Sequence, residues 1–282
     1  MRVLITGAQG MLGRTLCQTL SNVEIIACDR SELDITDARA VCSFFAEKKP
    51  DVVIHCAAMT AVDRCETEVD TAWNTNAIGT LNVANACRIV NARLIAISTD
   101  YVFEGNLDRP YHEFDQATGG HSVYAQSKWA SEKAVREHCP DHVIARVSWL
   151  YGPKGPSFVH TMLRLADGTR PFLKVVNDQV GNPTSTFAVA KALQCLLEHP
   201  EVVGTIHLTC EGEASWYDFA CKIFELTQKN QKVIPCTSDE YPTPAKRPKN
   251  SRLEKRVLRL RGLPAMPHWE QALADFLKTE TY

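Results

Sequence analysis

No sign of charge dominates this sequence of 282 residues, because 31 Lys and Arg stand against 33 Asp and Glu for a net charge of −2. A chain so close to neutrality has no overall field that draws it to nucleic acid or to an anionic membrane surface. It also lacks any run approaching about 18 uninterrupted apolar residues, the signature of a membrane-spanning helix. We therefore expect neither a nucleic-acid partner nor a membrane partner.

The sequence has eleven cysteines but no C-x-x-C spacing. The count is odd and most of these cysteines lie within apolar runs, which argues against a disulfide framework or a zinc site. We expect reduced thiols in the core and a reducing compartment. The first residues enter a strand-like run directly, with no charged leader before an apolar segment, so we expect a cytoplasmic protein.

Strand and helix patterns alternate through the first half of the chain. Apolar strands are predicted at 2–6, 24–28, 52–56, 93–97 and 142–147, and amphipathic helices at 11–20, 37–47, 68–90 and 122–138. This alternation predicts an α/β fold, a Rossmann-type doubly wound parallel sheet with helices on both faces. We expect residues 1–149 to form this dinucleotide-binding domain.

After residue 149 the pattern becomes irregular and prolines interrupt short segments. We expect residues 150–282 to form mainly a smaller substrate-binding lobe. Helices are predicted near 186–198, 215–229 and 268–278, and a strand at 204–209. The segments near 186–209 are expected to return to the first domain.

A glycine turn follows the first predicted strand. Gly7, Gly10 and Gly13 stand in the order strand, turn, helix, which is the arrangement that binds a dinucleotide pyrophosphate. Glycine permits the tight turn and the close backbone approach, and free N–H groups at the helix start attract the anion. A glycine-rich turn without a ligand is the alternative.

The residues after the second predicted strand bear on the choice of cofactor. Asp29 can accept hydrogen bonds from the adenosine ribose hydroxyls and would repel a 2′-phosphate, which favours NADH. Arg30 follows at once and can accommodate the 2′-phosphate of NADPH. NADH is therefore favoured while NADPH stays open. Asp34 and Ile35 are expected to reach the adenine, although Thr36 or Asp37 also suits a helix cap.

Further polar residues are expected at the ligand-binding edge, where parallel strands end. Ala57 and Ala58 follow one strand, and Ser98, Thr99 and Asp100 follow another. Tyr124 and Lys128 lie four residues apart in a predicted helix and so share one face. The lysine ammonium is expected to lower the pKa of the tyrosine toward working pH, so that the phenol can act as a general acid or base.

Six motifs together resemble the extended short-chain dehydrogenase/reductases, and within them the dTDP-4-dehydrorhamnose reductase family. They are AAMTAVD at 57–63, STDYVF at 98–103, the Tyr124/Lys128 pair, RVSWLYG at 146–152, NDQVGNPT at 177–184 and YPTPAKRPKNS at 241–251. The resemblance runs over essentially the whole length. The glycine triplet and the Tyr124/Lys128 pair would support only the superfamily, and the last two motifs, in the substrate lobe, indicate the narrower family.

The resemblance implies NAD(P)H-dependent reduction of the 4-keto group of dTDP-6-deoxy-L-lyxo-4-hexulose to dTDP-L-rhamnose. It makes Thr99, Tyr124 and Lys128 the catalytic set. The implied cofactor-binding residues are Gly7, Gln9, Gly10, Met11, Leu12, Gly13, Asp29, Arg30, Asp34, Ile35, Ala57, Ala58, Thr60, Asn76, Ser98, Tyr124 and Lys128. The implied substrate-binding residues are Thr60, Val62, Asp100, Tyr101, Tyr124, Trp149, Asn177 and Arg247, the last two toward the diphosphate.

Some relatives bind a divalent ion at a dimer contact through a glutamate after the glycine turn. Arg14 and Thr15 stand there in this sequence, so no metal site is expected, and a homodimer is left open. A crowded basic segment at 246–261 is expected to be either a solvated face or a diphosphate site.

Two other functions stay open from the sequence. One is a non-catalytic NAD(P)-binding regulatory subunit resembling the β subunit of methionine adenosyltransferase. The other is a nucleotide-sugar epimerase or dehydratase of the same superfamily.

Overall fold

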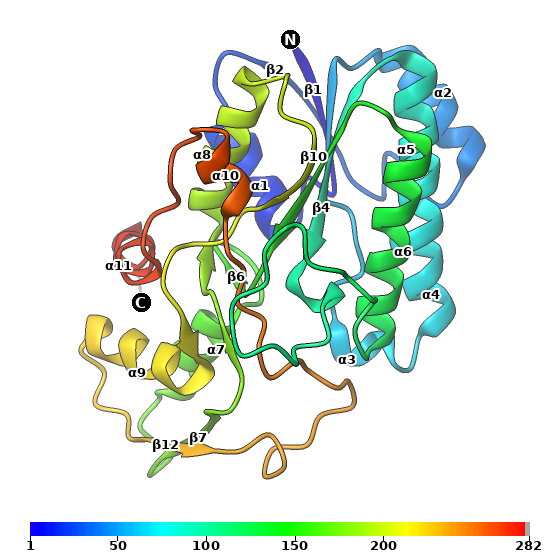
Figure 1. Ribbon diagram of the computed structural model, residues 1–282. Coiled ribbons are helices and arrows are strands. Elements are labelled where there is room, and N and C mark those ends of the chain that lie inside the picture. The colour runs from blue at the N-terminus through cyan, green and yellow to red at the C-terminus, as the bar shows by residue number, and fades with distance from the viewer. Residues whose placement is uncertain (280–282) are drawn as a thin grey trace.

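The first domain is built on a six-stranded parallel sheet (Figure 1). The computed structural model describes residues 1–279. The strands lie in the order β10-β5-β4-β3-β1-β2, so the direction of winding reverses between β1 and β3. Their bounds are β1 (Arg2–Thr6), β2 (Glu24–Cys28), β3 (Val52–His55), β4 (Arg93–Thr99), β5 (His142–Val147) and β10 (Gly204–His207). The predicted doubly wound parallel sheet is confirmed.

Helices cover both faces of this sheet (Figure 1). One face carries α1 (Met11–Thr19) and α8 (Thr186–Glu198), and the other carries α2 (Ala38–Lys48), α5 (Gly79–Val90) and α6 (Val123–His138). Successive side chains of a strand point to opposite faces, so Val3 and Ile5 join one core while Leu4 joins the other. Both cores are buried, which is why the strands read as continuous apolar runs.

The segment predicted as one helix at 68–90 is helical throughout 69–90, but a π turn divides it. The structure contains α4 (Val69–Trp73), a π-helical turn η1 (Asn74–Ile78) and then α5, with a further short helix α3 (Val62–Cys65) before them. A π turn inserts an extra residue and changes which side chains face inward. Here Asn76 becomes fully buried and hydrogen-bonds both the N–H and the carbonyl of Met59.

The second lobe is small and irregular. Its strand pairs are β6 (Leu150–Tyr151) with β9 (Thr184–Ser185), β7 (Leu173–Val176) with β12 (Val233–Cys236), and β8 (Val180–Gly181) with β11 (Ala214–Ser215). Its helices are α7 (Phe158–Leu165), α9 (Trp216–Thr227) and α11 (Trp269–Thr279). In its core the Tyr151 ring packs against Phe219 in a tilted contact and against Phe276 edge-to-face.

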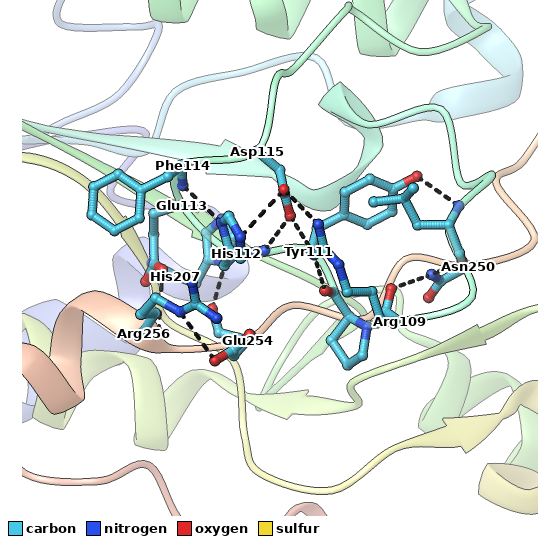
Figure 2. Close-up of polar contacts among 12 residues, drawn as sticks. Arg109, Tyr111, His112, Glu113, Phe114, Asp115, His207, Asn250, Glu254 and Arg256 are labelled. Atoms are coloured by element: carbon cyan, nitrogen blue, oxygen red, sulfur yellow. Dashed lines mark hydrogen bonds and ion pairs between the residues drawn. The ribbon is translucent and has the colours of Figure 1, made fainter.

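The chain crosses between the two regions several times. Helix α8 packs on α1 and strand β10 pairs with β5, so these two elements pack with the six-stranded sheet and its helices. The segment leading to α10 (Arg256–Leu260) is tied to the loop that follows the 3₁₀ turn η2 (Asp100–Val102) (Figure 2). In that contact the Glu113 carboxylate accepts hydrogen bonds from the backbone N–H groups of His207, Arg256 and Val257 at 3.2–3.3 Å.

Within residues 1–279, no helix combines the length and the apolar character needed to cross a membrane. All eleven cysteines are free thiols.

Candidate active site

Two adjoining cavities of about 630 and 440 Å³ open at the carboxyl ends of β1, β3 and β4. Gly7, Gly10, Ala58 and Thr60 line both. The first also contains the predicted residues Gln9, Asp29, Arg30, Asp34, Ile35 and Ala57. The second also contains Met11, Leu12, Gly13, Val62, Ser98, Thr99, Asp100, Tyr101, Tyr124, Lys128 and Trp149. Residues far apart in the sequence therefore meet at the switch point of the sheet, where such folds bind ligands.

The glycine turn fits a dinucleotide pyrophosphate. Gly7 has φ +65°, and a Cβ there would lie 2.7 Å from the Ala57 nitrogen. A Cβ on Gly13 would lie 2.2 Å from the Gly7 carbonyl oxygen, so neither position admits a side chain. Gly10 caps α1 without a side-chain hydrogen bond, which leaves the first N–H groups of the helix facing the cavity.

Asp29 is held in place at the far end of the first cavity. Its carboxylate accepts hydrogen bonds from the backbone N–H groups of Gln9 at 2.9 Å and Arg30 at 2.8 Å. The Arg30 side chain is 84% exposed and its guanidinium lies 3.9 Å from Asp34. Asp37 caps α2. The Asp34 carboxylate instead accepts hydrogen bonds from the Thr36 N–H and hydroxyl, which stabilise the turn there.

Thr99, Tyr124 and Lys128 come together in the second cavity. Ser122 caps α6 and thereby starts the helix one residue before Tyr124. The Thr99 hydroxyl donates to the Asp100 carboxylate at 2.9 Å, and the Lys128 ammonium donates to the Ile97 carbonyl at 2.8 Å. All these side chains except that of Ile97 are buried, so their charges act in a poorly hydrated environment.

Burial controls ionisation in this group. Burial raises the pKa of Tyr124 above its usual value, and the hydrogen bond with Thr99 only partly opposes the rise. The expected lowering of this pKa by Lys128 is therefore wrong for the structure, because desolvation outweighs every other influence on the phenol. Burial lowers the pKa of Lys128 to about 8 and raises that of Asp100 to about 7.

Aromatic side chains line the same cavity as Thr99, Tyr124 and Lys128. Tyr101 lies edge-on to Tyr124, with ring centroids 5.7 Å apart. Trp149 has φ +45°, a strained backbone for a bulky residue, and its indole stacks on Trp216 at 3.5 Å between centroids. A bulky residue held in a strained backbone conformation beside a cavity points to a binding role rather than to ordinary core packing. The indole edge also excludes any side chain at Gly181, where a Cβ would lie 2.5 Å from the ring.

Arg247 joins the two lobes at the mouth of the site. Its guanidinium donates to the Asp63 carboxylate at 2.9 Å and also lines a third cavity of about 410 Å³ with Gln179 and Trp216. Most other cations of the basic segment pair with carboxylates outside these three cavities: Arg252 with Glu213, Lys255 with Glu211, and Arg256 and Arg259 with Glu254. Most of these cations are thus held in ion pairs, and of the cations in this described segment only Arg247 lines one of the three cavities.

Two predicted site residues lie away from the cavity walls. Asn76 is buried and its amide is consumed by Met59 and Ser127, so it supports the loop behind the wall. Asn177 is exposed at the end of β7 and lines none of the three cavities. Gln179, two residues later, faces the third cavity and accepts a hydrogen bond from the Trp216 indole at 3.2 Å.

Several cavity residues were missed from the sequence. Phe158 and Trp216 line both the second and third cavities, and Asp63 holds Arg247. Only Asp63 carried a signal, since it ends the AAMTAVD motif. Phe158 and Trp216 are single aromatics at helix starts, and no local pattern distinguishes them from core residues.

Comparison with known proteins places these features in one family. The family model described as "RmlD substrate binding domain" matches residues 1–282. A dTDP-4-dehydrorhamnose reductase from Streptomyces griseus is 42% identical, covering 97% of this chain and 92% of that protein. A solved structure with that name from Clostridium acetobutylicum is 46% identical, with a TM-score of 0.96 and 99% of each chain covered. Another, from Bacillus anthracis in complex with NADP, is 40% identical with the same TM-score and coverage.

Proposed function

Because this chain belongs to the family of dTDP-4-dehydrorhamnose reductases, we propose that it reduces the 4-keto group of dTDP-6-deoxy-L-lyxo-4-hexulose to dTDP-L-rhamnose. It is an NAD(P)H-dependent oxidoreductase. The observation that carries the assignment of the site is that Thr99, Tyr124 and Lys128 share one cavity with the glycine turn.

Reduction of a ketone requires a proton donor beside the alkoxide that forms at the carbonyl oxygen. The bound NAD(P)H supplies a hydride to C4 of the sugar. Tyr124 gives its phenolic proton to the C4 oxygen, and the Thr99 hydroxyl steadies the negative charge that grows there. Lys128 holds the nicotinamide ribose and offsets the charge left on the phenol. A raised tyrosine pKa suits this direction, since the phenol is then protonated before the reaction.

Residues of both lobes are proposed to position the sugar nucleotide. We assign Val62, Asp100, Tyr101 and Trp149 to the sugar and Arg247 to the diphosphate. Thr60, between the two cavities, is assigned to both cofactor and substrate. Asn177 is not assigned a contact, because its side chain is exposed away from the cavities.

A coupled assay tests the proposed function. The keto-sugar nucleotide is generated with an upstream dehydratase and epimerase, and loss of nicotinamide absorbance is followed. The proposed function requires one NAD(P)H oxidised per sugar reduced. An epimerase or dehydratase would retain its cofactor without net oxidation. Folded protein that binds NADH but shows no substrate-dependent oxidation would support a regulatory subunit instead.

We also infer a preference for NADH over NADPH. Both residues line the first cavity, but the Asp29 carboxylate is fixed by two backbone N–H groups, whereas the Arg30 side chain is 84% exposed. A 2′-phosphate beside Asp29 would be repelled, so kcat/KM should be higher with NADH. Asp29→Ala should narrow that difference, and Asp37→Ala, which only removes a helix cap, should leave the ratio unchanged. Equal use of both cofactors by the unaltered protein would contradict the inference.

A further inference from the structure

Glu132 is a buried carboxylate on the same helix as Tyr124 and Lys128, one turn beyond the lysine. Only 1% of its surface is exposed. One oxygen accepts hydrogen bonds from the Ser98 hydroxyl at 2.6 Å and the Arg146 Nε at 2.8 Å. The other accepts from Arg146 at 2.8 Å and Arg136 at 2.7 Å. A buried charge with every hydrogen bond satisfied is costly to assemble, and it ties α6 to β4 and β5.

The two tethered strands lead directly into the site. Ser98 immediately precedes Thr99, and Arg146 lies three residues before Trp149. Because Arg146 holds the Glu132 carboxylate with two hydrogen bonds, this contact fixes the position of α6 relative to the ends of β4 and β5. We propose that Glu132 is a positioning residue that aligns Tyr124 with Thr99 and sustains the positive charge of Lys128. This rests on the catalytic roles proposed above.

The charges around Lys128 support an electrostatic part of this role. On its own helix it has Tyr124 and Glu132, and β5 contributes Arg146 through the Glu132 pair. His55 and Cys56 face it from the end of β3, and Asp100 shares its cavity from the end of β4. Burial lowers the pKa of Lys128, and Glu132 is the main influence that opposes this. For Glu132 itself, burial raises the pKa, but Arg146, Arg136 and the Ser98 hydroxyl together outweigh burial and lower the pKa to about 2, so the carboxylate is charged.

Two charge changes of opposite sign test the proposal. Glu132→Gln removes a negative charge near Lys128, so the alkaline limb of the pH profile of kcat/KM should move down by about one pH unit. Arg136→Gln removes a positive charge from the other side of the same carboxylate, so the limb should move up by about half a unit. Arg136 is 38% exposed, and this variant is expected to fold even if Glu132→Gln does not.

A second measurement does not depend on turnover. The pH dependence of NADH affinity, followed by nicotinamide fluorescence, should shift in the same two directions because Lys128 holds the ribose. Arg146→Lys keeps the charge while losing the fork of two hydrogen bonds. It should leave both pH limbs in place and lower kcat about tenfold, through misalignment of Tyr124.

The outcomes separate this proposal from the proposed function. Lack of turnover by the unaltered protein would overturn the reductase, while the fluorescence titration would still test Glu132. A purely structural Glu132 would lower activity in every variant without moving the limbs in opposite directions. If the pH limbs of Arg136→Gln coincide with those of the unaltered protein in both measurements, the electrostatic role of Glu132 is overturned. If kcat is unchanged in Arg146→Lys, the proposed alignment of Tyr124 is overturned.

Discussion

At the scale of single residues, Tyr124 and Lys128, which we propose to be catalytic, show how strongly burial affects ionisation. Tyr124 and Lys128 share a helix face as their spacing predicts, yet the lysine ammonium is hydrogen-bonded to the Ile97 carbonyl and desolvation governs the phenol. A sequence shows which charged groups are near in the chain. It does not show how much water remains around them, and that amount determines the direction of the pKa shift.

Tyr124→Phe tests the proton donor directly. The substitution removes one hydroxyl and leaves the ring, so turnover should fall by at least about 10²-fold to 10³-fold while NADH affinity stays nearly unchanged. Steady-state kinetics and a fluorescence titration measure the two quantities. Tyr101→Phe, in the same cavity, should mainly raise KM for the sugar nucleotide. Comparable loss of cofactor affinity and turnover in Tyr124→Phe would count against the role.

His55 makes the stability of the fold sensitive to acid. Its ring is buried between the hydroxyls of Thr6 and Thr80 at 2.7 and 3.0 Å, and burial lowers its pKa to about 3 from the usual 6.5. Between about pH 3 and pH 6.5, His55 is therefore protonated in the unfolded chain and neutral in the folded chain. The free energy of unfolding should fall as pH falls from about 6.5 toward 3, by up to about 1.4 kcal/mol per pH unit for this histidine.

Urea unfolding at a series of pH values checks this expectation. His55→Gln should flatten the slope while retaining a side chain that can hydrogen-bond both threonines. His121→Gln, at an exposed position, is the matched control and should leave the slope unchanged. The buried His207, whose pKa burial also lowers to about 3, and carboxylates with lowered pKa values such as Glu132 contribute to the slope that remains. An unaltered slope in His55→Gln would rule out the assigned contribution.

At the scale of elements, the loop before α6 is shaped by close packing. Gly120 has φ +55°, and a Cβ there would lie 2.3 Å from the Tyr101 carbonyl oxygen. Gly262 has a similar φ of +65° with nothing within 4 Å of a built Cβ. The two glycines therefore separate the cost of a left-handed backbone from the cost of a clash.

Gly262→Ala should lower the free energy of unfolding by about 1 kcal/mol, the cost of the left-handed conformation alone. Gly120→Ala should cost at least about 2 kcal/mol more, because either the loop or the Tyr101 backbone must move. Denaturant titrations measure both. Gly120→Ala should also lower kcat/KM, since Tyr101 contacts the Tyr124 ring. Equal destabilisation by the two substitutions would contradict the close approach.

At the scale of the whole molecule, one ion pair connects the lobes at the site. Asp63 and Arg247 are 184 residues apart in the chain, and their charged groups lie 2.9 Å apart. The Asp63 side chain is 42% exposed, so solvent screens the pair and its stability contribution should be below about 1 kcal/mol. We expect the ion pair to matter more for orienting the Arg247 guanidinium toward the sugar nucleotide.

Arg247→Met should raise KM for the sugar nucleotide about tenfold, because a charge-assisted hydrogen bond to the diphosphate is lost. Asp63→Asn should raise KM less, since Arg247 keeps its charge but loses its partner. Steady-state kinetics in a double-mutant cycle with both substitutions measures their coupling. Lys246→Met, an exposed neighbour with the same loss of charge, should leave KM unchanged. Strict additivity in the cycle would show that Asp63 does not orient Arg247.

The sequence by itself determined the sheet, its covering helices and the glycine turn. These depend on local periodicity and on backbone sterics, which neighbours in the chain specify. The strand ends then bring Gly7, Ala58 and Thr99 to one edge by topology alone. The same logic placed Tyr124 and Lys128 together.

Only the tertiary structure decided how the second lobe completes the site. The π turn buries Asn76, the end of β7 leaves Asn177 exposed, and α9 brings Trp216 onto Trp149. These placements depend on contacts between segments that are distant in the chain, and no local pattern encodes them. Burial likewise decided the direction of the pKa shifts of Tyr124 and Lys128, because desolvation is a property of the packed molecule and not of any one segment.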